Sequence, residues 1–192
     1  KVDTLVTLAA DTVADILGTD TNTNFPNANV IIGTVSDDII DGTPGSDLIA
    51  TFTGTDIVNP SDGNDKILGG ADVDTLNGGD GDDHIYGYAS NDILDGGADA
   101  DKILGGKGND TISGGSGNDD LRGEADKDSI ITGIGNDTVS GGLGDDTITI
   151  DGAGDKTIDG GAGDNNLIIN HSGISSFRDF VTKELDDSGA GA

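Results

Sequence analysis

A nine-residue repeat dominates this chain and limits the folds that it can adopt. Residues 33–149 divide into thirteen consecutive nonapeptides without an insertion or a deletion. The copies GGDGDDHIY (78–86) and GGKGNDTIS (105–113) show the pattern most clearly. A fixed period held over this length indicates a solenoid, in which each repeat stacks on its neighbours.

Two positions of the repeat keep their chemical character in every copy. The sixth residue is always aspartate: Asp38, Asp47, Asp56, Asp65, Asp74, Asp83, Asp92, Asp101, Asp110, Asp119, Asp128, Asp137 and Asp146. The eighth is always aliphatic: Ile40, Ile49, Val58, Ile67, Leu76, Ile85, Leu94, Ile103, Ile112, Leu121, Ile130, Val139 and Ile148. Low hydrophobicity with high net charge is typical of disorder, but a disordered acidic chain would not hold this register.

The residue types predict the conformation of each copy. Glycine at positions one, two and four permits left-handed backbone and close approach, so the first six residues are expected to form a turn. The last three are expected to form a short strand with one aliphatic side chain pointing inward. Two nonapeptides then make one coil. The predicted fold is an all-β, right-handed parallel β-roll, a β-solenoid with short capping segments at both ends.

The two-copy coil sorts the aspartates into two columns. The Asp38 column contains Asp38 and every eighteenth residue from it to Asp146, and the Asp47 column runs likewise from Asp47 to Asp137. Successive coils are expected to stack at the strand spacing of about 4.7–4.9 Å. Each column therefore places carboxylates close together, where they repel each other unless a counter-ion lies between them.

This pattern resembles the GGxGxDxUx repeat of the RTX (repeats-in-toxin) proteins, a calcium-binding β-helix signature. The resemblance covers residues 33–149. It implies that Ca²⁺ lies between adjacent loops of each column, bound by the thirteen sixth-position carboxylates and by backbone carbonyls of the loops. The gaps within the two columns suggest about 11 ions.

The charge of the chain fits this expectation. The sequence has 37 acidic residues against 9 basic ones, a formal net charge of −28. Nearly all the acidic residues are aspartate, which tolerates left-handed turns and reaches a metal from a tight loop. We therefore expect the calcium-free chain to be unfolded and the calcium-loaded chain to be folded. The same acidity argues against nucleic acid as a partner.

Some copies depart from the pattern at the glycine positions. Glycine is missing from the start of 51–59 and 60–68, so distortion of those two loops is expected. Aspartate occupies position four in three copies, at Asp72, Asp99 and Asp126. It either adds a metal ligand or merely tolerates the turn, and the second interpretation is favoured.

The repeat weakens at both ends. Residues 24–32 look like a degenerate copy that places Asn29 in a column. After an insertion at Ile150, Lys156 and Asn165 replace the column aspartate. An ammonium group cannot ligate calcium, although it can lie beside the last carboxylates. These coils are interpreted as caps that end the metal array.

Four segments follow from this organisation. Residues 1–32 are predicted to form an N-terminal cap, with a helix over 3–17. Residues 33–149 form the roll, residues 150–185 contain capping coils and an amphipathic segment, and residues 186–192 are a linker or tail. No run approaches the roughly 18 apolar residues of a membrane-spanning helix.

The side chains that flank the inward aliphatic residue are expected to point outward. On one sheet they form a basic and apolar face: Leu48, Ala50, Lys66, Leu68, His84, Tyr86, Lys102, Leu104, Asp120 and Arg122. This face is either an ordinary solvated surface or a docking surface around Tyr86 for another domain, a second copy or an acidic glycan.

No catalytic motif accompanies the repeat, and the chain is interpreted as non-enzymatic. His84 and His171 lie near no nucleophile pattern, and HExxH, P-loop and EF-hand motifs are absent. The resemblance implies a calcium-binding structural module of a protein secreted by a Gram-negative bacterium through type I export. It would fold in extracellular calcium. The alternatives are a self-assembly or adhesion module at the cell surface, or a non-catalytic roll of a larger secreted protease or lipase.

Overall fold

Successive strands of this chain alternate between two parallel sheets. The computed structural model describes residues 28–170, which contain strands and turns but no helix. One sheet holds the odd-numbered strands β1 (Asn29–Ile32), β3 (Asp47–Phe52), β5 (Lys66–Gly70), β7 (His84–Ala89), β9 (Lys102–Lys107), β11 (Asp120–Ala125), β13 (Asp137–Leu143) and β15 (Lys156–Asp159). The other holds β2 (Ile39–Asp41), β4 (Ile57–Asn59), β6 (Thr75–Asp80), β8 (Ile93–Ala98), β10 (Thr111–Ser116), β12 (Ser129–Ile131), β14 (Thr147–Ile150) and β16 (Asn166–Ile169).

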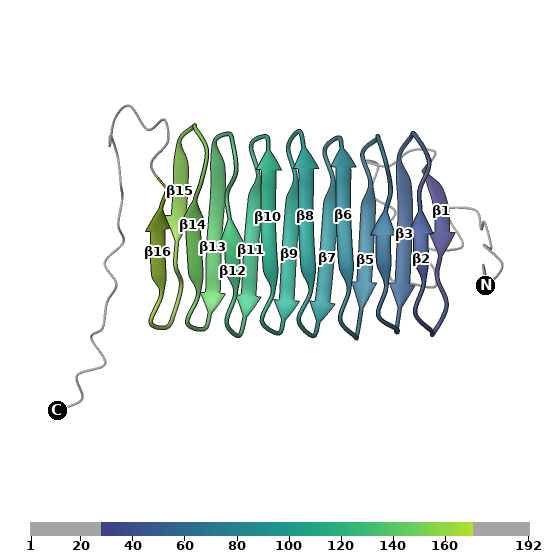
Figure 1. Ribbon diagram of the computed structural model, residues 1–192, viewed down its shortest axis with the longest axis horizontal. Helices are drawn as coiled ribbons and strands as arrows, with labels where there is room; N and C mark the ends of the chain where they lie inside the picture. The colour runs from purple at the N-terminus through teal and green to yellow at the C-terminus, as the bar shows by residue number, and fades with distance from the viewer. Residues whose placement is uncertain (1–27, 171–192) are drawn as a thin grey trace.

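Each coil consists of one strand from each sheet, and the coils stack in sequence order. Figure 1 shows this stack, with the colour passing steadily along its long axis from β1 to β16. The pairing joins residues 18 apart, as in Ile85 with Ile103. This register confirms the predicted parallel β-roll with two nonapeptides per coil.

The insertion at Ile150 changes the register by one residue. Val139 pairs with Ile158, and Ile148 pairs with Leu167, so the last coil spans 19 residues. Ile150 itself is buried, with 4% of its surface exposed. The extra residue therefore lengthens one strand without ending the stack, and β15 and β16 close the described part of the roll.

The strands are longer than the sequence suggested. Central strands such as β8 contain six residues, Ile93–Ala98, and thus include positions one to three of the following copy. Gly97 in β8 continues the parallel pairing with Gly79 and Gly115. The expectation of a six-residue turn was therefore wrong. The turn is confined to positions four to six, because the glycines at positions one and two still support sheet pairing.

Glycine serves two different purposes at the edges of the strands. At position two, Gly79 has a φ of 103°, which L-residues with a side chain adopt at a cost. At position one, a Cβ atom on Gly96 would lie only 2.7 Å from the carbonyl oxygen of Gly114 in the next coil. The glycine at position two thus permits left-handed backbone, and the glycine at position one permits close stacking of coils.

The core is a double file of aliphatic side chains between the sheets. All thirteen position-eight residues, Ile40 to Ile148, belong to one buried cluster, each with at most 3% of its surface exposed. Ile31 in β1 extends the cluster at one end, and Ile158 packs against it at the other. The inward direction predicted for this position is confirmed.

The two ends of the described region agree with the predicted degenerate copies. Asn29 pairs with Asp47, and Lys156 pairs with Asp137, so both stand in column positions. The predicted helix over 3–17 and the tail over 186–192 lie outside the described residues, as does the C-terminal amphipathic segment after residue 170. Within residues 28–170 no helix is present that could cross a membrane.

Candidate metal centre

The predicted column aspartates line the two edges where one sheet turns into the other. Asp38 is half-buried. The other twelve, from Asp47 to Asp146, have at most 3% of their surface exposed. Aspartate is seldom buried to this degree unless it has a partner. The structure therefore brings all thirteen predicted site residues together in two stacks.

From Asp56 and Asp65 onward, one oxygen of each column carboxylate links its coil to the previous one. The backbone N–H of Asp74 donates to Oδ1 of Asp92 at 2.8 Å, and that of Asp83 donates to Oδ1 of Asp101 at 2.9 Å. The same bond repeats through both columns with donor–acceptor distances of 2.7–3.1 Å. These ladders explain why every position-six residue needs a short side-chain acceptor.

A second ladder runs in the opposite direction at position five, on the exposed side of the loops. The backbone N–H of Asn109 donates to Oδ1 of Asn91 at 2.7 Å, and that of Asn136 donates to Oδ1 of Asn118 at 2.8 Å. Sequence reasoning missed this ladder. The recurrence of asparagine and aspartate at position five was the signal that could have revealed it.

The second carboxylate oxygen is left without a partner in most of the stack. In ten column residues, Oδ2 is buried and accepts no hydrogen bond: Asp56, Asp65, Asp74, Asp83, Asp92, Asp101, Asp110, Asp119, Asp128 and Asp146. A buried, unpaired carboxylate oxygen is costly, because it has lost the solvation of water without replacement. A row of such atoms is the donor set that a hard cation prefers.

The glycine at position one leaves the space around these oxygens. A Cβ atom on Gly87 would lie 2.5 Å from Oδ2 of Asp92, and one on Gly96 would lie 2.4 Å from Oδ2 of Asp101. Any side chain at this position would therefore press on the free oxygen. The cradle and the free oxygen together fit an ion that lies between two loops.

A metal in such a gap would draw on few carboxylates. Among residues 28–170, no three His, Cys, Asp or Glu side chains converge on one point. Calcium takes six to eight oxygen ligands, so backbone carbonyls of the loops would have to complete the coordination shell. This donor set agrees with the ligands that the resemblance implied.

The chain itself satisfies Oδ2 at three of the four column ends, Asp146 being the exception. The backbone N–H of Thr34 donates to Oδ2 of Asp38 at 2.6 Å, and that of Thr43 donates to Oδ2 of Asp47 at 2.7 Å. At the other end, Oδ2 of Asp137 forms an ion pair of 2.6 Å with the ammonium group of Lys156. The prediction that this lysine lies beside the last carboxylates is confirmed.

Burial changes the acidity of the column residues. Burial, opposed by the backbone hydrogen bond from Asp83 and reinforced by neighbouring carboxylates, raises the pKa of Asp101 to about 8. The same causes raise the pKa of Asp83, Asp92 and Asp128 to about 7. Burial in the metal-free columns thus makes the ionised form of these four aspartates less favourable than it is in water.

The irregular loops keep the column geometry. In copies 51–59 and 60–68, Asp56 and Asp65 make the ladder bonds to Asp74 and Asp83 at 2.9 and 2.7 Å. The expected distortion does not reach the column. The missing glycines appear instead as positive φ angles at position two: 77° at Phe52 and 112° at Ser61.

Two of the three aspartates at position four, Asp72 and Asp126, link adjacent loops. Oδ2 of Asp72 accepts from the backbone N–H of Gly54, and Oδ2 of Asp126 accepts from that of Gly108, both at 3.2 Å. These bonds lie on the exposed side of the loops. Asp99 and Asp126 also have φ angles of 74° and 78°. These φ angles agree with the favoured interpretation that aspartate tolerates the turn, while the hydrogen bonds to the preceding loop were not predicted.

The predicted outward face is only partly exposed. Ala50 and Leu68 are buried, with 2% and 6% of their surface exposed, so their expected exposure was wrong. In-register stacking places Leu68 between Ala50 and Tyr86, and these neighbours cover one another. Tyr86 stacks on Tyr88 with 6.1 Å between ring centroids, and Lys66 lies 5.6 Å from the centre of the Tyr86 ring.

Comparison with known proteins agrees with this geometry. A family model described as the RTX calcium-binding nonapeptide repeat matches the chain in four copies, over residues 32–67, 68–103, 95–130 and 113–148. No curated protein matches the chain.

Proposed function

Because the chain belongs to the RTX calcium-binding nonapeptide repeat family, we propose that it is a structural module whose roll forms when calcium enters the two aspartate columns. The main support for this proposal is that the buried Oδ2 atoms of the columns have no hydrogen-bond partner. In the metal-free roll each row is destabilising, since stacked carboxylates repel and have lost their water. A divalent cation between two carboxylates replaces their mutual repulsion by attraction to the cation.

The free oxygens also bear on the number of ions. The gaps within the columns suggest about 11 ions, and ten column aspartates have an Oδ2 without a partner. The three column aspartates without a free Oδ2 are Asp38 and Asp47, which bond to Thr34 and Thr43 at the start of the roll, and Asp137, which pairs with Lys156 near its end. We therefore propose that the count is close to ten, with the first gaps binding calcium most weakly.

The setting that we propose is extracellular. Proteins with this repeat are typically secreted by bacteria, and extracellular calcium modules bind their ion at roughly 10⁻⁴–10⁻³ M. The chain would pass through a type I exporter unfolded, in low calcium, and fold outside the cell. We assign the roll itself no catalytic role, and it serves equally well as the structural part of a larger secreted protease or lipase.

Circular dichroism of the full chain tests the calcium requirement. The spectrum should show β-structure in millimolar calcium and a disordered chain in excess chelator, and returning calcium should restore the signal. Magnesium at the same concentration is the matched control. It should restore less, because it demands octahedral geometry and dehydrates reluctantly. The same β-signal in chelator and in calcium would contradict the proposal.

A second candidate function is calcium-dependent self-assembly or adhesion through the face around Tyr86. Lys66, His84 and Lys102 lie in register on this face of a strongly acidic chain. Tyr88, which stacks on Tyr86, is 49% exposed. Stacked aromatic rings beside cations are suited to an anionic or aromatic partner surface.

Light scattering with and without calcium tests this alternative. Replacing Tyr86 and Leu104 by serine should abolish any calcium-dependent association. Ile93→Ser is the control, since Ile93 is 51% exposed on the opposite sheet. Unchanged scattering of the double variant, or equal loss in the control, would remove this candidate.

A further inference from the structure

Lys156 stands where the repeat would place the next aspartate of the Asp47 column. In the pairing of β13 with β15, Lys156 lies opposite Asp137. Its side chain is only 4% exposed, and that of Asp137 is completely buried. A lysine is rarely buried to this degree unless partners compensate its charge, because removing an ammonium group from water is costly.

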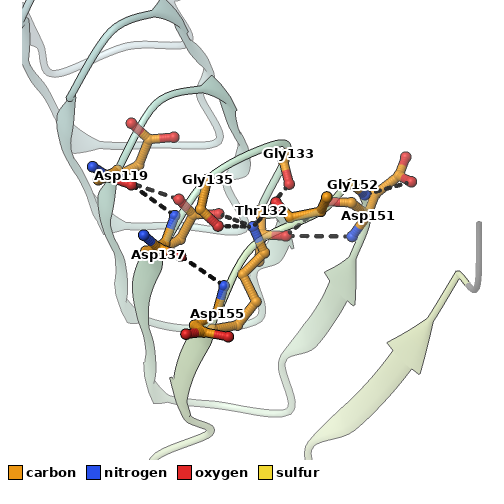
Figure 2. Close-up of polar contacts among 12 residues, drawn as sticks. Asp119, Thr132, Gly133, Gly135, Asp137, Asp151, Gly152 and Asp155 are labelled. Carbon is orange, nitrogen blue, oxygen red and sulfur yellow. Dashed lines mark hydrogen bonds and ion pairs between the residues drawn. The ribbon is translucent and has the colours of Figure 1, made fainter. Parts of the chain in front are cut away.

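The partners of this ammonium group come mainly from the preceding loop of the column. Nζ donates to the carbonyl oxygens of Gly135 at 2.6 Å and Gly133 at 3.0 Å, and to Oδ2 of Asp137 at 2.6 Å. Figure 2 shows Gly133, Gly135 and Asp137 arranged around one point, where the dashed lines meet. The carbonyl oxygen of Ala153, on the loop of Lys156 itself, is 3.5 Å away. Three short contacts use all three protons of the group.

The partners of Lys156 occupy repeat positions that recur in each earlier copy. Gly133, Gly135 and Asp137 are positions two, four and six of copy 132–140. Oδ2 at position six has no partner in Asp101 and Asp119, the two preceding members of this column, whereas in Asp137 it is bonded. Carboxylate and carbonyl oxygens are the ligands that calcium prefers. The ammonium group therefore marks a position between two loops where a cation is stable.

We propose that Lys156 is a resident cation that fills the last cation position of the Asp47 column, so that the gap between loops 132–137 and 151–156 binds no calcium. This inference rests on the proposed function, because it states where the calcium array stops. The attached ammonium group closes this end of the column independently of the calcium concentration. It also carries one positive charge where calcium would carry two.

The Asp38 column ends in a different way. Asn165 accepts the backbone N–H of Asp146 through Oδ1 at 2.8 Å and thus continues the ladder. Oδ2 of Asp146 nevertheless has no partner, and neither has Nδ2 of Asn165. The last gap of this column keeps a free anionic oxygen, while the last gap of the other column is neutralised by the chain.

Counting bound calcium in the full chain tests the proposal. The wild type, Lys156→Asp and Lys127→Gln are dialysed to equilibrium in saturating calcium, and the ions per chain are measured by elemental analysis. Lys156→Asp should bind one ion more than the wild type, because it restores the column carboxylate. Lys127→Gln removes a charge from an exposed residue and should leave the number unchanged. An unchanged number in Lys156→Asp would overturn the inference, and a wild type without calcium would overturn the proposed function as well.

A second measurement needs no variant and covers the case in which Lys156→Asp fails to fold. Anomalous scattering from crystals of the wild type grown in calcium should show peaks in the earlier gaps of both columns. No peak should appear between Gly133, Gly135 and Asp137. A calcium peak at that point, with Lys156 displaced, would contradict the resident cation even if all other gaps bind calcium.

Discussion

The backbone N–H of Asp92 donates a hydrogen bond of 2.8 Å to Oδ1 of Asp110, one coil further along the chain. The bond joins two anions of the same column and leaves Oδ2 of each without a partner. The carboxylate therefore has two separate tasks. Oδ1 aligns the coils, and Oδ2 is available to a cation.

Asp92→Asn should separate these two tasks. Asparagine can keep the ladder bond, as Asn165 does with Asp146, but it removes the anionic Oδ2. We expect a higher midpoint of calcium-induced folding and a loss of about 1–3 kcal/mol in the free energy of unfolding in calcium. Asp95→Asn removes an exposed charge from the same coil and should change little. Equal calcium titrations of the two variants, followed by circular dichroism, would contradict the role of Oδ2.

Gly96→Ala should destabilise the calcium-loaded roll. Its Cβ atom would lie 2.4 Å from Oδ2 of Asp101 and 2.7 Å from the carbonyl oxygen of Gly114, whereas Gly45 has no atom within 4 Å of such a Cβ. Overpacking of this kind costs about 1–3 kcal/mol. Gly45→Ala should be neutral or stabilising by up to about 1 kcal/mol. Thermal unfolding in saturating calcium checks both, and similar midpoints would show that the cradle at position one is not required.

Ile103→Ala should cost about 2–5 kcal/mol, because it opens a cavity in the file of aliphatic side chains. Ile103 is completely buried, while Ile93 in the preceding strand β8, on the opposite sheet, is 51% exposed. Ile93→Ala should therefore change the free energy of unfolding by no more than about 0.5 kcal/mol. Denaturant unfolding in calcium measures the difference. A comparable loss of unfolding free energy in the two variants would show that the buried aliphatic file does not stabilise the roll.

Without calcium, acid should favour the roll. Burial raises the pKa of Asp101 to about 8 and that of Asp92 to about 7 above the ordinary value of 3.8. A group whose folded pKa is raised contributes stability below its unfolded pKa, and this contribution is lost as the pH rises through the folded value. The β-signal of the calcium-free chain should therefore be larger near pH 4 than near pH 8, with the stabilisation decreasing between about pH 4 and 8.

Calcium should reverse this dependence. Because protons and calcium compete for the same carboxylates, the calcium needed for folding should increase as the pH falls below about 7. Circular dichroism in calcium-free buffer and in calcium, measured at a series of pH values, checks both statements. A β-signal of the calcium-free chain that is independent of pH would show that protonation of the columns does not stabilise the roll.

The sequence was sufficient to predict the repeating part of the fold. Period nine, with aspartate at position six and an aliphatic residue at position eight, sets which residues point inward and which form columns. The pairing of Ile85 with Ile103 follows from that period alone, given two copies per coil. The same reasoning placed Asn29 and Lys156 in column positions, although neither is an aspartate. These features depend on the same local conformation in every copy. They can therefore be predicted from the repeat in the sequence.

Contacts between coils could not be derived in this way. Only the stacked structure decides that Asp92 donates toward Asp110 while Asn109 donates toward Asn91 in the opposite direction. It likewise decides that Lys156 reaches back 19 residues to Oδ2 of Asp137. Each of these bonds depends on the offset between adjacent loops, a distance that no local pattern contains. The repeat thus determined where the carboxylates stand, and the packing of coil on coil decided which of their oxygens remain available for calcium.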